Sequence, residues 1–151
     1  MTDFSEAELI DSLAQRLANR GLVRYNPTVP YGADDPTLPA FIDGNLPPDP
    51  DTAVAVKVLT DRRDRDEYNP DIDIRLRFRT AVNRVGPSVG DYADAVFMHL
   101  HVPDHQYRPQ VWPGGIRVID VRRVLRGQSA QDTNGRSTRA DDYRLTLNPR
   151  S

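Results

Sequence analysis

The sequence contains no cysteine, which excludes disulfide bonds, thiolate nucleophiles and cysteine-ligated zinc. No apolar run approaches the roughly 18 residues that a membrane-spanning helix needs, so we expect no membrane partner. The first residues, Met1–Glu6, lack the basic and apolar regions of a signal peptide. Phosphate-binding, serine-hydrolase and zinc-peptidase motifs are absent too. We therefore expect neither an enzyme nor a cofactor.

Lysine is nearly absent, because Lys57 is the single lysine among 20 basic residues. A GC-rich genome is the simpler explanation, and the functional alternative is that arginine serves bidentate pairing at interfaces. The 22 acidic residues give a formal net charge of −2, so no global charge favours nucleic acid or anionic membranes. The length of 151 residues predicts one domain, 1–151, that can bury a core without metal.

A helix is predicted over residues 6–20. Ser5 and Glu8 form a capping-box pattern, and Gly21 supplies the C-terminal stop. The apolar residues of this segment fall on one helical face, so the helix should lie against a partner surface.

The segment from Asn26 to Pro50 is rich in proline and lacks periodicity, so we predict mostly loop. Short strands are predicted before it, at Leu22–Tyr25, and inside it, at Ala40–Ile42. Apolar residues within this loop, such as Tyr31 and Phe41, indicate that the loop packs against another surface.

Two strands are predicted next. Residues 53–59 are rich in β-branched side chains, which is typical of a buried strand. Residues 72–78 alternate strictly between apolar and charged, which predicts one face in the core. Arg75, Arg77 and Arg79 then form a row on the other face.

The remainder predicts a helix and two more strands. Ser88 caps a helix that runs to about residue 100, and residues 116–124 form a strand whose alternation slips at Ile119, as at a bulge. Asn134-Gly135 is a favoured hairpin turn, and residues 143–147 alternate as a final strand. The fold class is therefore α+β, with two layers: a mainly antiparallel four- to five-stranded sheet and two amphipathic helices on one face.

The best candidate for chemistry is the group of His99, His101 and His105, which could bind zinc in a metal-dependent enzyme. Two residues apart on a helix, however, His99 and His101 point to nearly opposite sides. Incidental histidines at a helix end are the favoured interpretation, so we predict no metal site. The acidic pairs lie in polar turns or on the exposed strand face, where solvated carboxylates are expected.

The arginine row also fits a nucleic-acid backbone, but its face carries no aromatic residues for stacking. A salt-bridged exposed face or a subunit interface is the favoured interpretation.

Several segments, taken in order, carry a family resemblance. They are Gly21–Pro27, Pro39–Asp51, Ala53–Val58, Asp91–Val96, Asp132–Arg136 and Asp142–Leu147. In this order the chain resembles the tail terminator proteins of long non-contractile-tailed phages, a group also labelled tail-completion or minor capsid proteins. The resemblance covers nearly the whole length, and none of these segments is a catalytic motif.

The resemblance implies a structural virion protein that assembles in the host cytoplasm and acts at the tail–head junction. Such proteins form a homo-oligomeric ring, usually a hexamer, at the head-proximal end of the tail tube. The ring ends polymerisation of the major tail tube protein and docks to head-completion or connector proteins, while genomic DNA passes through its centre. A head-completion or stopper protein of the same neck is the alternative.

Ring subunits need two different contact surfaces. The candidate contacts are in the proline-rich loop, the arginine row and the hairpin tip: Tyr31, Phe41, Arg75, Arg77, Arg79, Asn134, Gly135 and Arg136. We expect the arginines to pair with acids of an adjacent subunit. An ordinary polar turn is the alternative for the hairpin tip.

Overall fold

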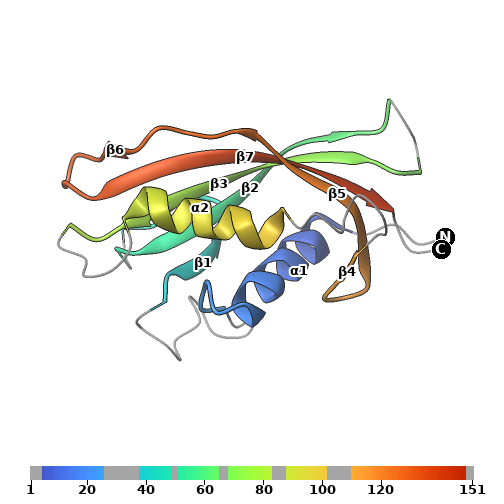
Figure 1. The fold of residues 1–151 in the computed structure, drawn as a ribbon, viewed down its shortest axis with the longest axis horizontal. Coiled ribbons are helices and arrows are strands. Elements are labelled where there is room, and N and C mark those ends of the chain that lie inside the picture. The colour runs from blue at the N-terminus through green and yellow to red at the C-terminus, as the bar shows by residue number, and fades with distance from the viewer. Residues whose placement is uncertain are drawn as a thin grey trace.

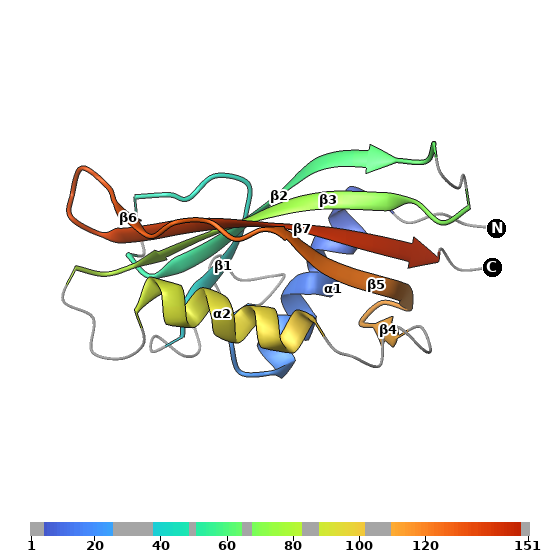
Figure 2. The same ribbon diagram turned by 45° about the horizontal axis from the view of Figure 1, so that its top comes forward.

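The computed structural model describes residues 5–25, 38–48, 51–64, 68–82, 88–101 and 110–148. Across these residues, two helices pack on one face of a curved, seven-stranded sheet (Figures 1 and 2). The helices are α1 (Glu6–Asn19) and α2 (Val89–Leu100). The strands are β1 (Ala40–Asp43), β2 (Ala53–Arg62), β3 (Asp71–Thr80), β4 (Gln110–Trp112), β5 (Ile116–Leu125), β6 (Ala130–Gln131) and β7 (Ser137–Asn148).

The strand order is β1-β2-β3-β7-β5-β4, with β6 paired to β7. β1 is parallel to β2, and the other strand pairings in the described ranges are antiparallel. The predicted class and the two helices are confirmed, but four to five strands was too few. β4 and β6 contain three and two residues, which is too short for a periodic signal.

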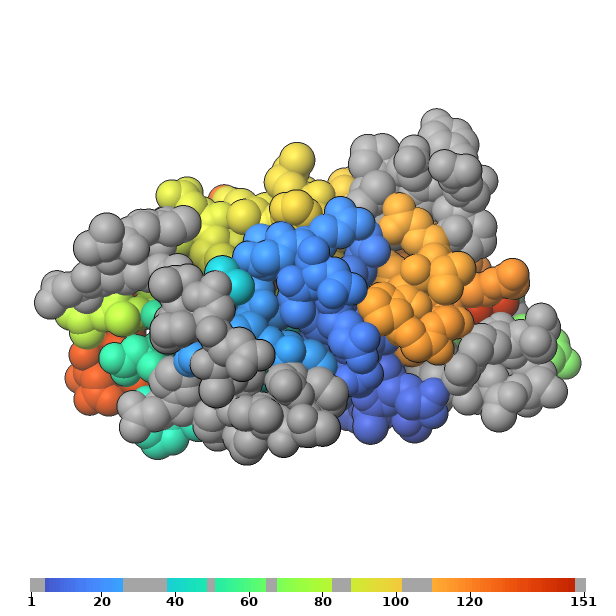
Figure 3. All heavy atoms as spheres, turned by 90° about the horizontal axis from the view of Figure 1, so that it is seen from below, coloured from blue at the N-terminus to red at the C-terminus, as the bar shows by residue number. Residues whose placement is uncertain are grey.

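Helix α1 begins as its capping box predicts. The Ser5 hydroxyl accepts a hydrogen bond from the Glu8 amide at 3.1 Å, and the Glu8 carboxylate accepts from the Ser5 amide at 3.4 Å. The helix ends before Gly21, whose φ of +72° lies in the left-handed region that glycine tolerates. Seen from below, α1 covers the middle of the molecule beside the β4–β5 region (Figure 3).

The core lies between the helices and one face of the sheet. Every apolar residue of the alternating β3 pattern is at most 2% exposed, and so are those of β7: Ile72, Ile74, Leu76, Phe78, Tyr143, Leu145 and Leu147. Each such side chain contributes about 1.5–3 kcal/mol by leaving water. The alternation therefore decides which face of β3 and β7 carries the helices.

The predicted bulge and turn are both present. The β5–β7 register shifts between Val118 and Asp120, on either side of Ile119. In the hairpin turn, the Gly135 amide donates to the Asp132 carbonyl at 3.0 Å, with a φ of +78° at Gly135. Neither described helix is long and apolar enough to cross a membrane.

Strand β7 is longer than the predicted strand at residues 143–147, because it begins at Ser137. The cause is a pair of charged residues in core-facing positions. Arg139 is 4% exposed and Asp141 is 0% exposed. Charged residues stand where apolar residues would be expected, so the alternation of apolar and polar residues becomes recognisable only from Tyr143 onward.

Candidate assembly surface

The sheet face opposite the helices, called here the open face, is lined by charged side chains that pair within the chain. Arg75 donates two hydrogen bonds to Asp142 across β3 and β7, at 2.7 and 3.0 Å. One step along, Arg144 binds Asp73 at 2.9 Å. Asp73 also accepts from Thr60 at 3.1 Å. The open face is therefore a ladder of cross-strand ion pairs, as expected for opposite charges facing each other in a sheet.

Hydrogen bonds within this ladder favour the charged forms of Arg75 and Asp73. Hydrogen bonding to Asp142 raises the pKa of Arg75. Burial alone would raise the pKa of Asp73, but hydrogen bonds from Arg144 and Thr60 outweigh it and lower that pKa. The lowered pKa favours the ionised form of Asp73.

The arginine row is only partly available to a partner. Arg75 is held by Asp142, and Arg79 is 4% exposed. Arg79 donates to the carbonyls of Asp51 and Pro47, at 2.8 and 2.6 Å. Arg77 is exposed and makes no ion pair with any described residue. Pairing of the row with an adjacent subunit stays a prediction, and Arg75 and Arg79 already have partners in their own chain.

Arg136 at the hairpin tip also binds its own chain. Its guanidinium donates to the Pro48 carbonyl at 2.9 Å and pairs with Asp51 at 3.2 Å. It also pairs with Asp132 at 2.8 Å, which raises the pKa of Arg136. Only 12% of its side chain is exposed, and its assignment as a partner contact stays a prediction.

Arg79 and Arg136 together bind the backbone carbonyls of Pro47, Pro48 and Asp51 over the open face (Figure 2). Beneath them, Leu46 packs on a small cluster of Ala40, Ile42, Ala53 and Ala55. The structure thus brings together the end of the proline-rich segment, the arginine row and the hairpin tip. The sequence indicates each of the three regions separately, and their contact with one another depends on the tertiary structure.

The other named residues divide by exposure. Phe41 is 4% exposed and packs edge-to-face on Tyr25, with ring centroids 5.7 Å apart. In the register of β1 with β2, Phe41 faces the helix layer and belongs to the core, and its assignment to a contact surface stays a prediction. Tyr31 lies outside the described residues. Asn134 is exposed at the hairpin tip, and Gly135 adopts the positive φ that this turn requires.

A second charged cluster, on the helix side of the sheet, was not predicted. Asp94 of α2 accepts from Arg123, Arg126 and Arg139, at 2.9, 2.7 and 2.9 Å. Asp141 of β7 accepts from Arg139 at 2.9 and 3.0 Å. This network ties α2 to β5 and β7, and hydrogen bonds from Arg126 and Arg139 hold the pKa of Asp94 well below its usual range. The sequence does contain a sign of this network, because Arg139 and Asp141 lie four and two residues before Tyr143 and therefore share its face of the strand.

The histidine group is not assembled into a site in the described residues. The His101 ring stacks on Phe97 at 5.1 Å, and its Nδ1 lies 3.2 Å from the Val121 carbonyl oxygen. His99 lies in the last turn of α2, and His105 falls outside the described residues. Over the ranges that the structure describes, no three potential metal ligands cluster together.

The two edges of the sheet differ. The outer side of β1 is covered at its start, because the Arg24 backbone amide donates to the Pro39 carbonyl at 2.9 Å and the Arg24 carbonyl accepts from the Phe41 amide at 3.2 Å. At the other edge, β4 covers only residues 116–118 of β5. From Asp120 onward, β5 has no strand on its outer side among the described residues. Val124 and Leu125 are about half exposed there, at 48% and 52%.

No protein-family model matches the chain, and no curated protein matches it. Among solved structures, the chain is similar to one in the "Virion of native gene transfer agent (GTA) particle". The TM-score is 0.53 and the sequence identity 18%, over 92% of this chain and 93% of that chain. At this identity the likeness shows a shared fold, and it extends over nearly the full length of both chains.

Proposed function

We propose that the chain is a structural protein of a phage-like virion and acts as its tail terminator. The observation that carries the virion role is the fold likeness to a chain of a gene transfer agent virion, which spans 92% of this chain and 93% of that one. The tail-terminator role rests further on the ordered sequence segments that resemble that family. In this role the protein forms a hexameric ring at the head-proximal end of the tail tube and docks to connector proteins of the head.

The geometry supports a ring subunit in two ways. First, among the described residues, Arg24 bridges the sheet edge at β1 whereas β5 has no strand on its outer side from Asp120 onward, so the chain presents unlike surfaces to its two neighbours, as a closed ring requires. Second, the ion pairs of the open face and the network around Asp94 are satisfied internally, which holds those surfaces in one shape.

The open edge of β5 is our first candidate for the contact between subunits. Its outer backbone groups can pair with a strand of a neighbour, and Val124 and Leu125 offer apolar area beside them. Arg77 and Asn134 remain candidates for contacts with other virion proteins, because both side chains are exposed.

Native mass spectrometry and negative-stain electron microscopy of the purified full chain test this proposal. We expect a hexameric ring at roughly 20 μM subunit, since specific interfaces of ordinary size have dissociation constants of micromolar or below. Mixed with assembling tail tube protein, the rings should sit at one end of each tube and limit its length. A chain that stays monomeric and leaves tube length unchanged contradicts the proposal. Binding to head connectors without capping of tubes would instead favour a head-completion protein.

A further inference from the structure

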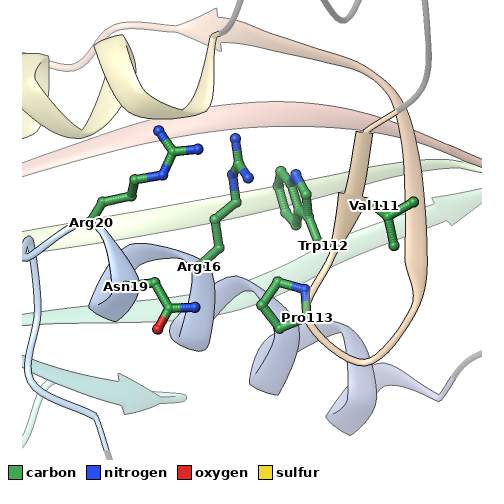
Figure 4. A pocket seen from close by; sticks show the side chains of 6 residues that line it. All are labelled: Arg16, Asn19, Arg20, Val111, Trp112 and Pro113. Atoms are coloured by element: carbon green, nitrogen blue, oxygen red, sulfur yellow. The ribbon is translucent and has the colours of Figure 1, made fainter.

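A hollow of about 370 Å³ opens between the end of α1 and the β4–β5 turn (Figure 4). The chain brings α1 and β4 into contact here, next to each other on the surface (Figure 3). The hollow is lined by Arg16, Asn19, Arg20, Val111, Trp112 and Pro113. Among the described residues, its lining contains two arginines and no acidic residue, in contrast to the paired arginines of the open face.

Arg16 carries a largely buried charge with neutral partners. It is 8% exposed, donates to the Gln110 side-chain oxygen at 2.9 Å, and lies 5.0 Å from the centre of the Trp112 ring. Its Nε is buried and has no hydrogen-bond partner in the described structure. A buried guanidinium without a carboxylate is costly, because water no longer solvates it and no counter-charge replaces the water.

Arg20 adds a second positive charge one helical turn later. Figure 4 shows the guanidinium groups of Arg16 and Arg20 extending in the same direction. Burial, and then the charge of Arg20, lower the pKa of Arg16. Like charges four residues apart destabilise a helix, although their position at a helix C-terminus offsets part of this. Neither arginine has a carboxylate partner within the described ranges.

Trp112 also has a buried donor without a partner, in addition to the Nε of Arg16. The residue is 1% exposed, and its indole Nε1 is buried without a hydrogen-bond partner among the described residues. Both nitrogen atoms are shut off from solvent, so an outside ligand is recognised by the two guanidinium charges, of which Arg20 is exposed. Two positive charges without a carboxylate among the described residues favour an anion.

We propose that this hollow binds the carboxylate of an acidic side chain from another protein chain. A carboxylate presents two oxygens in one plane, which matches the donor fork of a guanidinium. Val111 and Pro113 give the hollow an apolar side for the aliphatic part of the incoming side chain. A nucleic-acid backbone fits less well, since the chain has a net charge of −2 and the basic groups form a single spot without a track. The inference holds for any protein partner and does not depend on the tail-terminator role.

Trp112 lines the hollow and is the single tryptophan of the sequence, so its fluorescence and indole N–H resonance report on binding there. The experiment titrates the full chain with N-acetyl-aspartate N-methylamide at constant ionic strength and follows both Trp112 emission and the indole N–H resonance. The matched neutral probe is N-acetyl-asparagine N-methylamide. We expect a saturating response to the aspartate probe with a Kd on the order of 10 mM, as befits a single small anion. The asparagine probe should give no saturating response.

Two variants assign the response to the hollow. Arg20→Gln should weaken binding of the aspartate probe by about tenfold, the usual effect of losing one charged hydrogen bond. Arg122→Gln is the matched control, because its side chain is 70% exposed and pairs with Asp120, outside the hollow. It should leave binding unchanged. The indole resonances of each variant show whether it is folded.

Three results would overturn the proposal. They are no saturating response in the natural chain, an equal response to the neutral probe, and unchanged binding in Arg20→Gln. Inorganic phosphate and a short oligonucleotide are titrated in parallel. Tighter binding of either would assign the hollow to a phosphate and remove the acidic protein partner.

Discussion

The buried pair of Arg139 and Asp141 offers the sharpest test of the packing between helix α2 and the sheet. The side chain of Asp141 is fully buried, and Arg139 donates to both of its oxygens at 2.9 and 3.0 Å. Asp141 also accepts from the Gly127 amide at 2.9 Å. The substitution Asp141→Asn keeps the shape of the side chain but removes its charge and replaces one acceptor oxygen with a donor.

The expected cost follows from what remains around Arg139. Removing one partner of a buried ion pair costs about 3–5 kcal/mol. Asp94 still accepts from Arg139 at 2.9 Å in the variant, so the lower end, about 3 kcal/mol, applies. For a chain of this size that corresponds to a fall in Tm of roughly 6–12 °C. Urea denaturation followed by Trp112 emission and circular dichroism measures this cost.

Asp142→Asn is the matched control, because it makes the same change at the next residue on the opposite face of the sheet. Its partner Arg75 is 32% exposed, so water compensates and the cost should be about 1 kcal/mol or less. The double variant Arg139→Met with Asp141→Leu should be more stable than Asp141→Asn, since it leaves no unpaired buried charge in the pair. Equal costs for Asp141→Asn and Asp142→Asn would refute the reasoning.

Three further predictions concern other surfaces. The pKa of Asp94 is lower in the folded chain than in the unfolded chain. The ionised carboxylate therefore stabilises the fold above the unfolded pKa, about 4, and this contribution is lost as the pH falls toward the folded pKa. Asp94→Asn should consequently make the free energy of unfolding, measured by urea denaturation, fall less steeply with pH between roughly pH 6 and 2. Replacing Val124 and Leu125 with lysine should abolish ring formation in native mass spectra while leaving Tm within about 2 °C, because both side chains are half exposed and lysine blocks edge pairing. Arg79→Met should speed amide hydrogen exchange over residues 51–53 by about tenfold, which is the usual effect of losing a charged hydrogen bond. Arg77→Met is the control, because Arg77 is exposed in the same row, and it should leave this exchange rate unchanged.

Each of these has an outcome that counts against it. An acid limb that is as steep in Asp94→Asn as in the natural chain would mean that other carboxylates dominate acid unfolding. Rings that persist in the double lysine variant would move the subunit contact away from β5. Equal exchange in the Arg79 and Arg77 variants would show that the guanidinium of Arg79 does not anchor this segment.

Much of the fold is readable from local signals. The capping box at Ser5, the alternation in β3, the slip at Ile119 and the Asn134-Gly135 turn each depend on residues within a few positions of one another. Such signals survive in a bare sequence because the geometry of a cap, a pleat or a turn is set by its own backbone.

The candidate surfaces were harder to predict, because their residues meet only across the sheet. Arg79 and Arg136 are 57 positions apart and bind the same segment. Alternation places Arg75 and Arg79 on the open face, but it does not indicate that Asp142 and two carbonyl groups already occupy them. An arginine with a partner in its own chain and one that awaits a neighbour look alike in sequence.

By itself, the sequence determined the helices, the main strands and the absence of a recognised catalytic motif, since these depend on local periodicity and residue type. Only the tertiary structure decided which charges are satisfied. It paired the open-face arginines, buried Arg139 with Asp141, and left Arg16 and Arg20 together without an acid among the described residues. The physical reason is that a charge is stabilised by whatever lies within a few ångströms, and long-range folding alone sets those neighbours.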